Sequence, residues 1–306
     1  MRFVMPAAAL LILSKAERNI MTKLFTPDKI QIPKIAAIHD LCGYGSCSLT
    51  TAISVLSAAG LEACPVPTSY LSTHTAFGSY TFFDTTENLP AYLDHWCEVK
   101  VPLAGAYTGF LGSVEQIHII IDFFNKNPGM LRVVDPVMAD LGVIYNTYTE
   151  EMCLEMKKLA SAADLITPNL TEAAVLLGTN YQGQFLDKSQ TQDICDRLLQ
   201  LGCKHVVLKG IRRDEAALIW NAIASQDGSY TEYGHKRVNA SMHGTGDLFA
   251  SIVTAGIFSG KELEDTVRFA GELVYDAIEF SFSQEGWQNR GVNFEPFLSK
   301  IADFCG

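Results

Sequence analysis

Short apolar runs alternate with longer segments of helical periodicity along most of the chain, the pattern of successive strands and helices. The apolar runs predict strands at 34–39, 62–69, 101–108, 131–134, 165–167 and 205–209. The periodic segments predict helices at 47–59, 88–99, 113–125, 150–160, 170–177, 189–201, 245–259, 262–280 and 294–304. Two further runs, 216–223 and 230–238, flank Asp227-Gly228 and predict an antiparallel pair. The pattern therefore predicts a three-layer α/β/α protein, with a mostly parallel central sheet and helices on both faces.

No linker, repeat or low-complexity tract interrupts this alternation, so we interpret residues 34–306 as a single domain. Residues 1–33 are interpreted as an N-terminal extension outside the core. The apolar run 7–13 in this extension is at the short limit for a signal peptide and precedes a poor cleavage region. The run is also too short to span a bilayer. Since Met21 lies just ahead of the first strand, we interpret residues 1–20 as an upstream extension from a misplaced start codon.

Composition narrows the possible partners. A hydrophobic content of 48% with 19% charged residues is typical of a globular chain. The formal net charge of −11, with no Lys/Arg run, argues against a nucleic-acid partner. The eight cysteines have neither zinc-ribbon nor disulfide-framework spacing and are interpreted as buried thiols of a reducing compartment. We therefore expect a cytoplasmic protein that binds neither nucleic acid nor membrane.

A glycine-rich turn opens the predicted helix at 245–259. Gly244 and Gly246 flank Thr245, so the backbone can turn tightly and bring successive N–H groups to one point. The N-terminus of a helix favours an anion there, and Asp247 places a carboxylate beside it. A phosphate cradle next to a potential base is what phosphoryl transfer to a hydroxyl requires. The alternative interpretation is an ordinary turn with an N-cap.

Polar residues also follow the predicted strands at their carboxyl ends, where open α/β sheets bind ligands. Asp135 could hold a magnesium-bound water near a triphosphate, or form an Asp-Pro turn. Asn169 could face a ligand, or cap the next helix together with Glu172, whose carboxylate could also join a metal shell. Lys209 is either a solvated strand end or a cation for nucleotide phosphates.

Two loops near the N-terminus could contact a small polar ligand. Asp40 and Tyr44 lie in a Gly-rich loop after the first strand, and His74 and Thr75 lie in a polar loop after the second. Each residue could equally belong to an ordinary loop, and a lone histidine is more often structural than catalytic. The first loop lacks a lysine and the spacing of a P-loop, which disfavours a Walker-type NTPase.

Together these motifs resemble the ribokinase-like vitamin kinases, specifically the pyridoxal/pyridoxamine kinase branch. The resemblance extends from about residue 34 to beyond 280 and is carried by the segments 38–40, 43–45, 73–75, 109–113, 135–138, 167–172, 207–209 and 244–247. It implies transfer of the ATP γ-phosphate to the 5′-hydroxymethyl group of a B6 vitamer: pyridoxal, pyridoxamine or pyridoxine. It also implies Mg²⁺, often a monovalent cation such as K⁺, and a homodimer.

The resemblance assigns roles to residues of this chain. It implies that Asp247 is the base and contacts the vitamer, and that the anion hole is Gly244, Thr245 and Gly246. It implies an ATP side formed by Asp135, Thr167, Asn169, Glu172 and Lys209, with Asp135 and Glu172 near the metal. It implies a vitamer side formed by Asp40, Tyr44, His74, Thr75 and Phe110.

Two positions depart from the pattern of that branch. Asp40 stands where serine is frequent, and Phe110 stands where many members carry tyrosine. An ionised carboxylate accepts hydrogen bonds but cannot donate them. If Asp40 reaches the 4′ end of the ring, it would favour pyridoxamine, which carries an ammonium group there; if it faces the ring nitrogen, it would discriminate little, since all three vitamers share that atom.

Two other functions remain as alternatives. Hydroxymethylpyrimidine kinases of thiamine synthesis share the chemistry, but they often have cysteine at the position of Asp247 and a loop richer in Gly-Gly. A catalytically silent vitamer-binding relative would not need Asp247, Lys209 and Asp135 together.

Overall fold

The computed structural model describes residues 23–181, 183, 185–213, 218–240, 242–286 and 290–306. In these residues one nine-stranded sheet has the strand order β11-β10-β9-β8-β5-β4-β1-β2-β3. Its strands are β1 (Lys34–Cys42), β2 (Glu62–Leu71), β3 (Phe82–Asp84), β4 (Leu103–Thr108), β5 (Leu131–Val134), β8 (Leu165–Ile166), β9 (His205–Ile211), β10 (Leu218–Ser225) and β11 (Tyr230–Lys236). The strands from β9 to β2 run parallel, whereas β3, β10 and β11 are antiparallel additions at the two edges.

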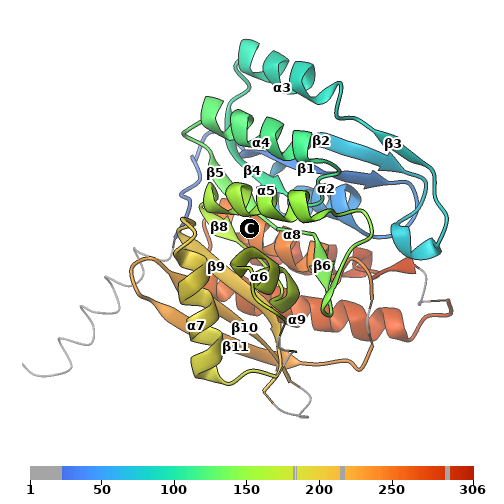
Figure 1. Cartoon of the computed structure of the whole chain (residues 1–306), viewed down its shortest axis with the longest axis vertical. Helices are drawn as coiled ribbons and strands as arrows, with labels where there is room; N and C mark the ends of the chain where they lie inside the picture. Colours follow the sequence, from blue (N-terminus) through green and yellow to red (C-terminus); the bar gives the residue numbers. More distant parts are fainter. Residues whose placement is uncertain (1–22, 182, 184, 214–217, 241, 287–289) are drawn as a thin grey trace, which may run out of the picture.

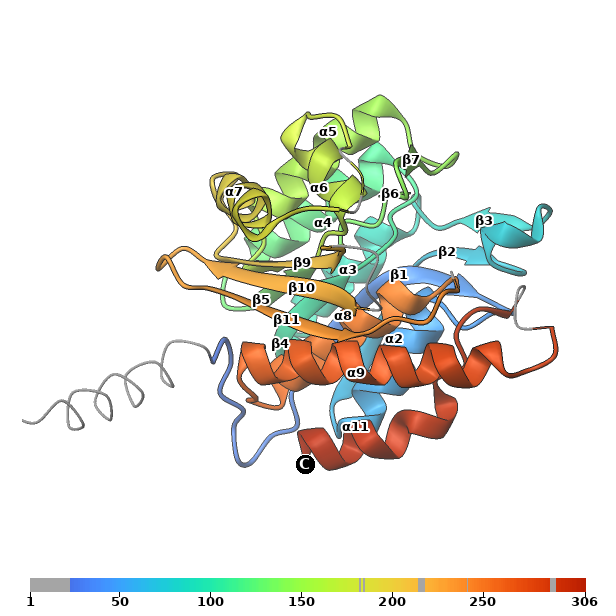
Figure 2. The same cartoon turned by 90° about the horizontal axis from the view of Figure 1, so that it is seen from below.

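Helices cover both faces of the sheet (Figures 1 and 2). One layer contains α3 (Leu89–Glu98), α4 (Val114–Lys126), α5 (Glu150–Ser161), α6 (Leu170–Leu177) and α7 (Lys188–Leu199). The other contains α2 (Ser48–Ala58), α8 (Thr245–Phe258), α9 (Leu263–Phe282) and α11 (Leu298–Cys305). The three-layer α/β/α fold with a mostly parallel sheet, predicted from the hydrophobic pattern, is confirmed.

The core consists of two apolar clusters, one on each face of the sheet. Successive residues of β1 point to opposite faces, so Ile38 belongs to one cluster and Ile35 to the other. Phe258 at the end of α8 is fully buried and lies directly on Gly105 of β4, where an added Cβ would come within 2.2 Å of its ring. Burial of both faces fixes the register of the parallel strands and therefore the place where each strand ends.

Short elements differ from the prediction. The edge strand β3 and a separate hairpin, β6 (Ala139–Asp140) with β7 (Val143–Ile144), lie in segments for which no strand or helix is predicted. The predicted helix 294–304 is divided into a 3₁₀ turn, Glu295–Phe297, and α11. Strands of two or three residues are too short for an alternating pattern to stand out from a loop. Residues 216 and 217 of the predicted hairpin lie outside the described residues.

The segment just before β1 contacts the body of the protein. The ring of Phe25 lies 5.1 Å from that of Phe258, centroid to centroid, and Pro27 packs against Gly260. Residues 1–20, interpreted above as an upstream extension, lie outside the described residues. No helix in the described part of the chain is long and apolar enough to cross a membrane.

These contacts predict different results for two truncations. A protein starting at Met21 should match the full chain in melting temperature and activity. A protein starting at Lys34 loses the packing of Phe25 on Phe258. Its free energy of unfolding should therefore be lower by about 1–3 kcal/mol. Thermal unfolding of the three proteins measures this difference. Failure of the Met21 protein to fold would show that residues 1–20 pack into the body.

Candidate active site

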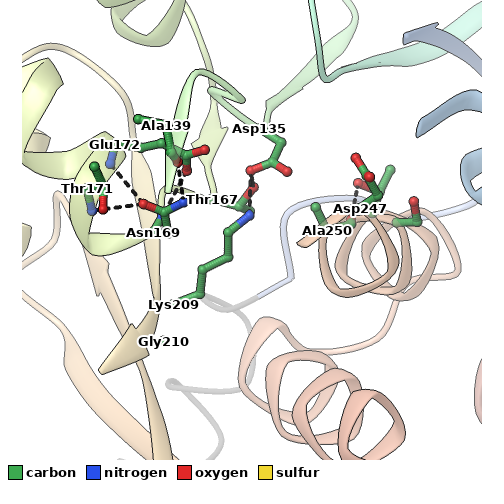
Figure 3. Close-up of polar contacts among 12 residues, drawn as sticks. Asp135, Ala139, Thr167, Asn169, Thr171, Glu172, Lys209, Gly210, Asp247 and Ala250 are labelled. Carbon is green, nitrogen blue, oxygen red and sulfur yellow. Dashed lines mark hydrogen bonds and ion pairs between the residues drawn. The ribbon is translucent and has the colours of Figure 1, made fainter. Parts of the chain in front are cut away.

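The carboxyl ends of the parallel strands bring most of the predicted site residues to one edge of the sheet. Asp40 lies in β1, Asp135 follows β5, Thr167 follows β8, and Lys209 lies in β9. Parallel strands end at the same edge, so this proximity follows from the sheet order. Figure 3 shows Asp135 and Lys209 pointing toward one another, with Asp247 at the start of α8 beside them.

A buried ion pair stands at the centre of this edge. The Lys209 ammonium lies 2.7 Å from Asp135 Oδ1, and the Thr167 hydroxyl donates to the same oxygen at 2.8 Å. Asp135 is 1% exposed. Burial would lower the pKa of Lys209, but the charges of Asp135, Glu172 and Asp247 oppose it and raise this pKa above its usual value. Lys209 is therefore a cation at neutral pH, as the kinase interpretation requires.

The N-terminus of α6 has a complete capping box. Asn169 accepts hydrogen bonds from the N–H groups of Thr171 and Glu172, and its own N–H donates to Glu172 Oε2 at 2.8 Å. Its amide nitrogen donates to the Ala139 carbonyl at 2.8 Å, which holds the β6–β7 hairpin against α6. The capping alternative for Asn169 is thus confirmed, whereas a contact with a nucleotide stays a prediction.

Glu172 is buried at 2% exposure next to the ion pair. Burial raises the pKa of its carboxyl group well above the usual value, Lys209 opposes the shift, and the charge of Asp135 adds to it. A nearby cation would favour the ionised form. Among the described residues no group of three or more His, Cys, Asp or Glu side chains could hold a metal ion by itself.

The glycine turn before α8 has the backbone that the sequence predicts. Gly244 has φ +80°, and an added Cβ would lie 2.0 Å from the Ser46 carbonyl oxygen, so only glycine fits. The Thr245 hydroxyl donates to the Met242 carbonyl at 3.2 Å and ties the turn together. At Gly246 an added Cβ would lie 3.6 Å from Lys209 Nζ. The ammonium group therefore stands beside the helix N-terminus, and both attract an anion at the same place.

Asp247 is half-buried in the first turn of α8. Burial raises the pKa of its carboxyl to about 7, helped by the charges of Asp40 and Asp135 and opposed by the Ser48 N–H and by Lys209. A carboxyl that titrates near neutral pH is a stronger base than an ordinary aspartate, which is the property a general base needs.

Ser48, which the sequence did not single out, lies between two of these carboxylates. It begins α2 with φ +50°, an uncommon value for a residue other than glycine. Its N–H bonds to the carboxylate of Asp247, and its hydroxyl bonds to that of Asp40. A serine after a Gly-rich loop is common in sequences, so no sequence signal distinguishes this one.

Asp40 is held inward. Its carboxylate accepts from Cys42 Sγ at 3.3 Å as well as from Ser48, and it is 5% exposed. Burial raises the pKa of Asp40, and these two hydrogen bonds oppose the shift. The net pKa is raised, so Asp40 ionises less readily than an ordinary aspartate on the side where the sequence predicts the vitamer.

His74 packs in the wall of the site. The ring is buried, lies 4.7 Å from the Phe77 ring and 5.1 Å from the His243 ring, and covers Gly45, where an added Cβ would meet it at 2.3 Å. These contacts are consistent with the structural alternative weighed from the sequence, and contact of His74 with a substrate stays a prediction. They also join its loop to the turn that His243 opens.

The other predicted substrate residues are less enclosed. Tyr44 is 50% exposed with its ring 5.6 Å from that of Phe77, and Thr75 is exposed at the start of a 3₁₀ turn. Phe110 is half-buried with its ring 5.8 Å from that of Tyr148. Their contact with a substrate stays a prediction.

A cavity of 390 Å³ extends from Thr245 along α9 and the end of β11. Its lining includes Lys236, Arg237, Asn239 and Tyr275, which combine positive charge with an aromatic ring. A larger cavity of 560 Å³ lies between α6 and α7 and shares none of these residues. Because the smaller cavity reaches the glycine turn, it is the better candidate for a nucleotide.

Comparison with known proteins agrees with this geometry. Residues 36–291 match a family described as phosphomethylpyrimidine kinase. A solved structure of a putative phosphomethylpyrimidine kinase from Bacteroides thetaiotaomicron, in a crystal form with pyridoxal, is 33% identical, covers 89% of this chain and 96% of its own, and superposes with a TM-score of 0.85. Pyridoxal kinase from Lactobacillus plantarum is 29% identical, with coverage of 89% and 98% and a TM-score of 0.82.

A curated relative is named for a different substrate. Hydroxymethylpyrimidine/phosphomethylpyrimidine kinase from Haemophilus influenzae is 30% identical over 179 residues, which are 58% of this chain and 65% of that relative. The similarity thus includes enzymes named for both substrates. The chain belongs to the phosphomethylpyrimidine kinase family, within the ribokinase-like vitamin kinases, and is a kinase of this family, which is similar to enzymes named pyridoxal kinase and hydroxymethylpyrimidine kinase alike.

Proposed function

We propose that this protein transfers the γ-phosphate of ATP to the 5′-hydroxymethyl group of a B6 vitamer. The observation that carries the proposal is the position of Asp247, whose carboxyl has a pKa of about 7, directly behind the Gly244–Gly246 turn. The similar chain from Bacteroides thetaiotaomicron, whose crystal form contains pyridoxal, supports a vitamer as the acceptor.

In this proposal each residue acts on a charge or a proton. The acceptor hydroxyl is a poor nucleophile, and Asp247 takes its proton as its oxygen bonds to the γ-phosphorus, while the bond from that phosphorus to the bridging oxygen breaks and ADP leaves. The N–H groups of the glycine turn and the Lys209 ammonium stabilise the negative charge on the transferred phosphoryl group. Ser48 and Lys209 both favour the ionised Asp247, the form that accepts the proton.

The nucleotide lies in the 390 Å³ cavity, with its phosphates at Thr245. Asp135 and Glu172 fit a magnesium ion, because Mg²⁺ binds through one or two carboxylates together with substrate phosphates. Bound there, it would neutralise charge on those phosphates. Thr167 holds Asp135, and Asn169 holds Glu172 by the bonds described above. A monovalent cation such as K⁺, a homodimeric assembly and a cytoplasmic location complete the proposal as predictions from the sequence and its resemblance.

A second candidate is phosphorylation of hydroxymethylpyrimidine. The family description and the relative from Haemophilus influenzae favour it. The two reactions use the same phosphate chemistry on a hydroxymethyl group, so the glycine turn and the ion pair serve both. Asp247 is the residue that disfavours this candidate, since hydroxymethylpyrimidine kinases often have cysteine there.

Substrate choice can be measured directly. ATP consumption, coupled to ADP detection, is followed with pyridoxal, pyridoxamine, pyridoxine and hydroxymethylpyrimidine. We expect kcat/KM to be at least about tenfold higher for a vitamer than for hydroxymethylpyrimidine, the scale of discrimination from a few site contacts. Among the vitamers, pyridoxamine should be preferred if its ammonium group pairs with Asp40 and keeps that carboxylate ionised, and Asp40→Ser should reduce the preference. A higher kcat/KM for hydroxymethylpyrimidine would establish the second candidate, and binding without ATP consumption would indicate a non-catalytic relative.

A further inference from the structure

Residues 290–293, which we call the C-terminal brace, connect two loops of the candidate site. The Ser46 N–H donates to the Arg290 carbonyl at 3.2 Å, and the Val292 N–H donates to the His243 carbonyl at 3.0 Å. Ser46 and Gly291 also form a parallel β-bridge. The brace is thus hydrogen-bonded both to the loop that precedes α2 and to the turn that precedes α8.

The three segments meet backbone to backbone. Gly291 has φ +80°, and an added Cβ would lie 3.2 Å from the His243 carbonyl oxygen and 3.3 Å from that of Ser46. The Ser46 carbonyl oxygen also blocks any side chain at Gly244. With glycine on both sides, a shift of the brace is transmitted directly to the two loops.

The brace itself is fixed to the rigid part of the protein. Val292 is fully buried, and Phe294, the residue that follows the brace, is 2% exposed; both belong to the apolar cluster that includes α2, α8 and α9. The Asn293 N–H donates to Ser281 Oγ at 2.7 Å, and Ser281 is fully buried in α9. Close packing of this kind holds a backbone in one position.

Both loops continue directly into residues of the candidate active site. The loop at Ser46 continues to Ser48, whose N–H bonds to Asp247, and the turn at His243 continues to Gly244. We propose that the C-terminal brace is a positioning element of the active site, which aligns the loop before α2 with the glycine turn. The inference rests on the proposed function only in taking that turn as the phosphoryl-binding site. A displacement of about 1 Å of such groups costs on the order of 10²-fold in rate.

Two glycine variants test this role. In Gly291→Ala the new Cβ pushes against both loops, whereas in Gly286→Ala (φ +72°) it meets no described atom within 4 Å. Both variants carry the strain of an L residue at positive φ, so the control removes that contribution. We expect Gly291→Ala to lower kcat at least about tenfold with KM for ATP within about twofold, because the brace does not line the nucleotide cavity. Gly286→Ala should retain kcat within about twofold.

Hydrogen exchange provides a readout that does not depend on activity. In the wild-type protein the amides of Ser46 and Val292 should exchange at similar, slow rates, because both are released when the brace opens. In Gly291→Ala both should exchange faster. Unequal rates in the wild type, unchanged kcat in folded Gly291→Ala, or an equal loss in Gly286→Ala would each overturn the proposal. The kinetic comparison uses whichever alcohol is phosphorylated, so a wrong vitamer assignment leaves this test intact.

Discussion

Asp247→Asn should lower kcat by about 10² or more while leaving the fold and most ATP binding in place, the usual scale for loss of a general base. The asparagine has the shape of the aspartate but cannot take the proton of the acceptor hydroxyl. The expected loss appears in kcat rather than in KM for ATP, because Asp247 is not among the residues that line the nucleotide cavity.

The pH dependence follows from the same carboxyl. Because the pKa of Asp247 is about 7 in the free protein, kcat/KM should rise as pH increases through that value, since only the ionised form accepts a proton. Stability should change with pH in the opposite direction to activity. The pKa is raised in the folded protein, so the folded state binds this proton more tightly and loses stability as pH rises from about 4 toward 7. Asp247→Asn removes that loss and should melt no lower than the wild type at pH 8.

Asp265→Asn is a matched control, because Asp265 occupies the third position of α9 as Asp247 does in α8. Both carboxylates interact favourably with a helix N-terminus, but Asp265 lies outside the site. It should retain kcat. If Asp247→Asn keeps wild-type turnover, Asp247 is not the base. If it instead loses melting temperature with a matching loss of activity, Asp247 is only a helix cap.

The placement of the central residues could be predicted from the sequence because it depends on topology. Apolar runs show where parallel strands end, and parallel strands end together, so Asp135 and Lys209 had to meet. The glycine turn could be predicted for a similar reason, since it is local and opens a strongly apolar helix.

Other features could not be predicted because they depend on contacts between distant segments. The position of Ser48 between Asp40 and Asp247 arises only when α2 and α8 are packed together. The brace at Gly291 needs a bridge to Ser46, 245 residues earlier by their numbers, and no local pattern records it. In the same way, the sequence showed that Asn169 could cap a helix or face a ligand, and only the hydrogen bonds identified the cap.

Lys209→Met should lower both stability and activity, because it leaves Asp135 buried without its cation. Removing one partner of a buried ion pair costs about 3–5 kcal/mol, and the lost positive charge beside the glycine turn should lower kcat/KM by about 10² or more. Lys204→Met is the control: Lys204 forms an ion pair of the same 2.7 Å length with Asp164, but its side chain is 65% exposed rather than 12%. That exposed pair should contribute less than about 1 kcal/mol.

Adding Asp135→Asn to Lys209→Met separates the effect of Lys209 on stability from its effect on activity. In the double variant no buried charge is left unpaired, so part of the lost stability should return. Activity should not return, because the double variant has neither the Lys209 ammonium nor the carboxylate proposed to bind the metal. Denaturant unfolding and kcat/KM of both single variants and the double variant complete the cycle. If Lys209→Met unfolds no more easily than Lys204→Met, Asp135 is satisfied without the lysine and the ion pair does not organise this edge of the sheet. If stability falls but kcat/KM does not, Lys209 holds Asp135 in place without acting on the phosphates.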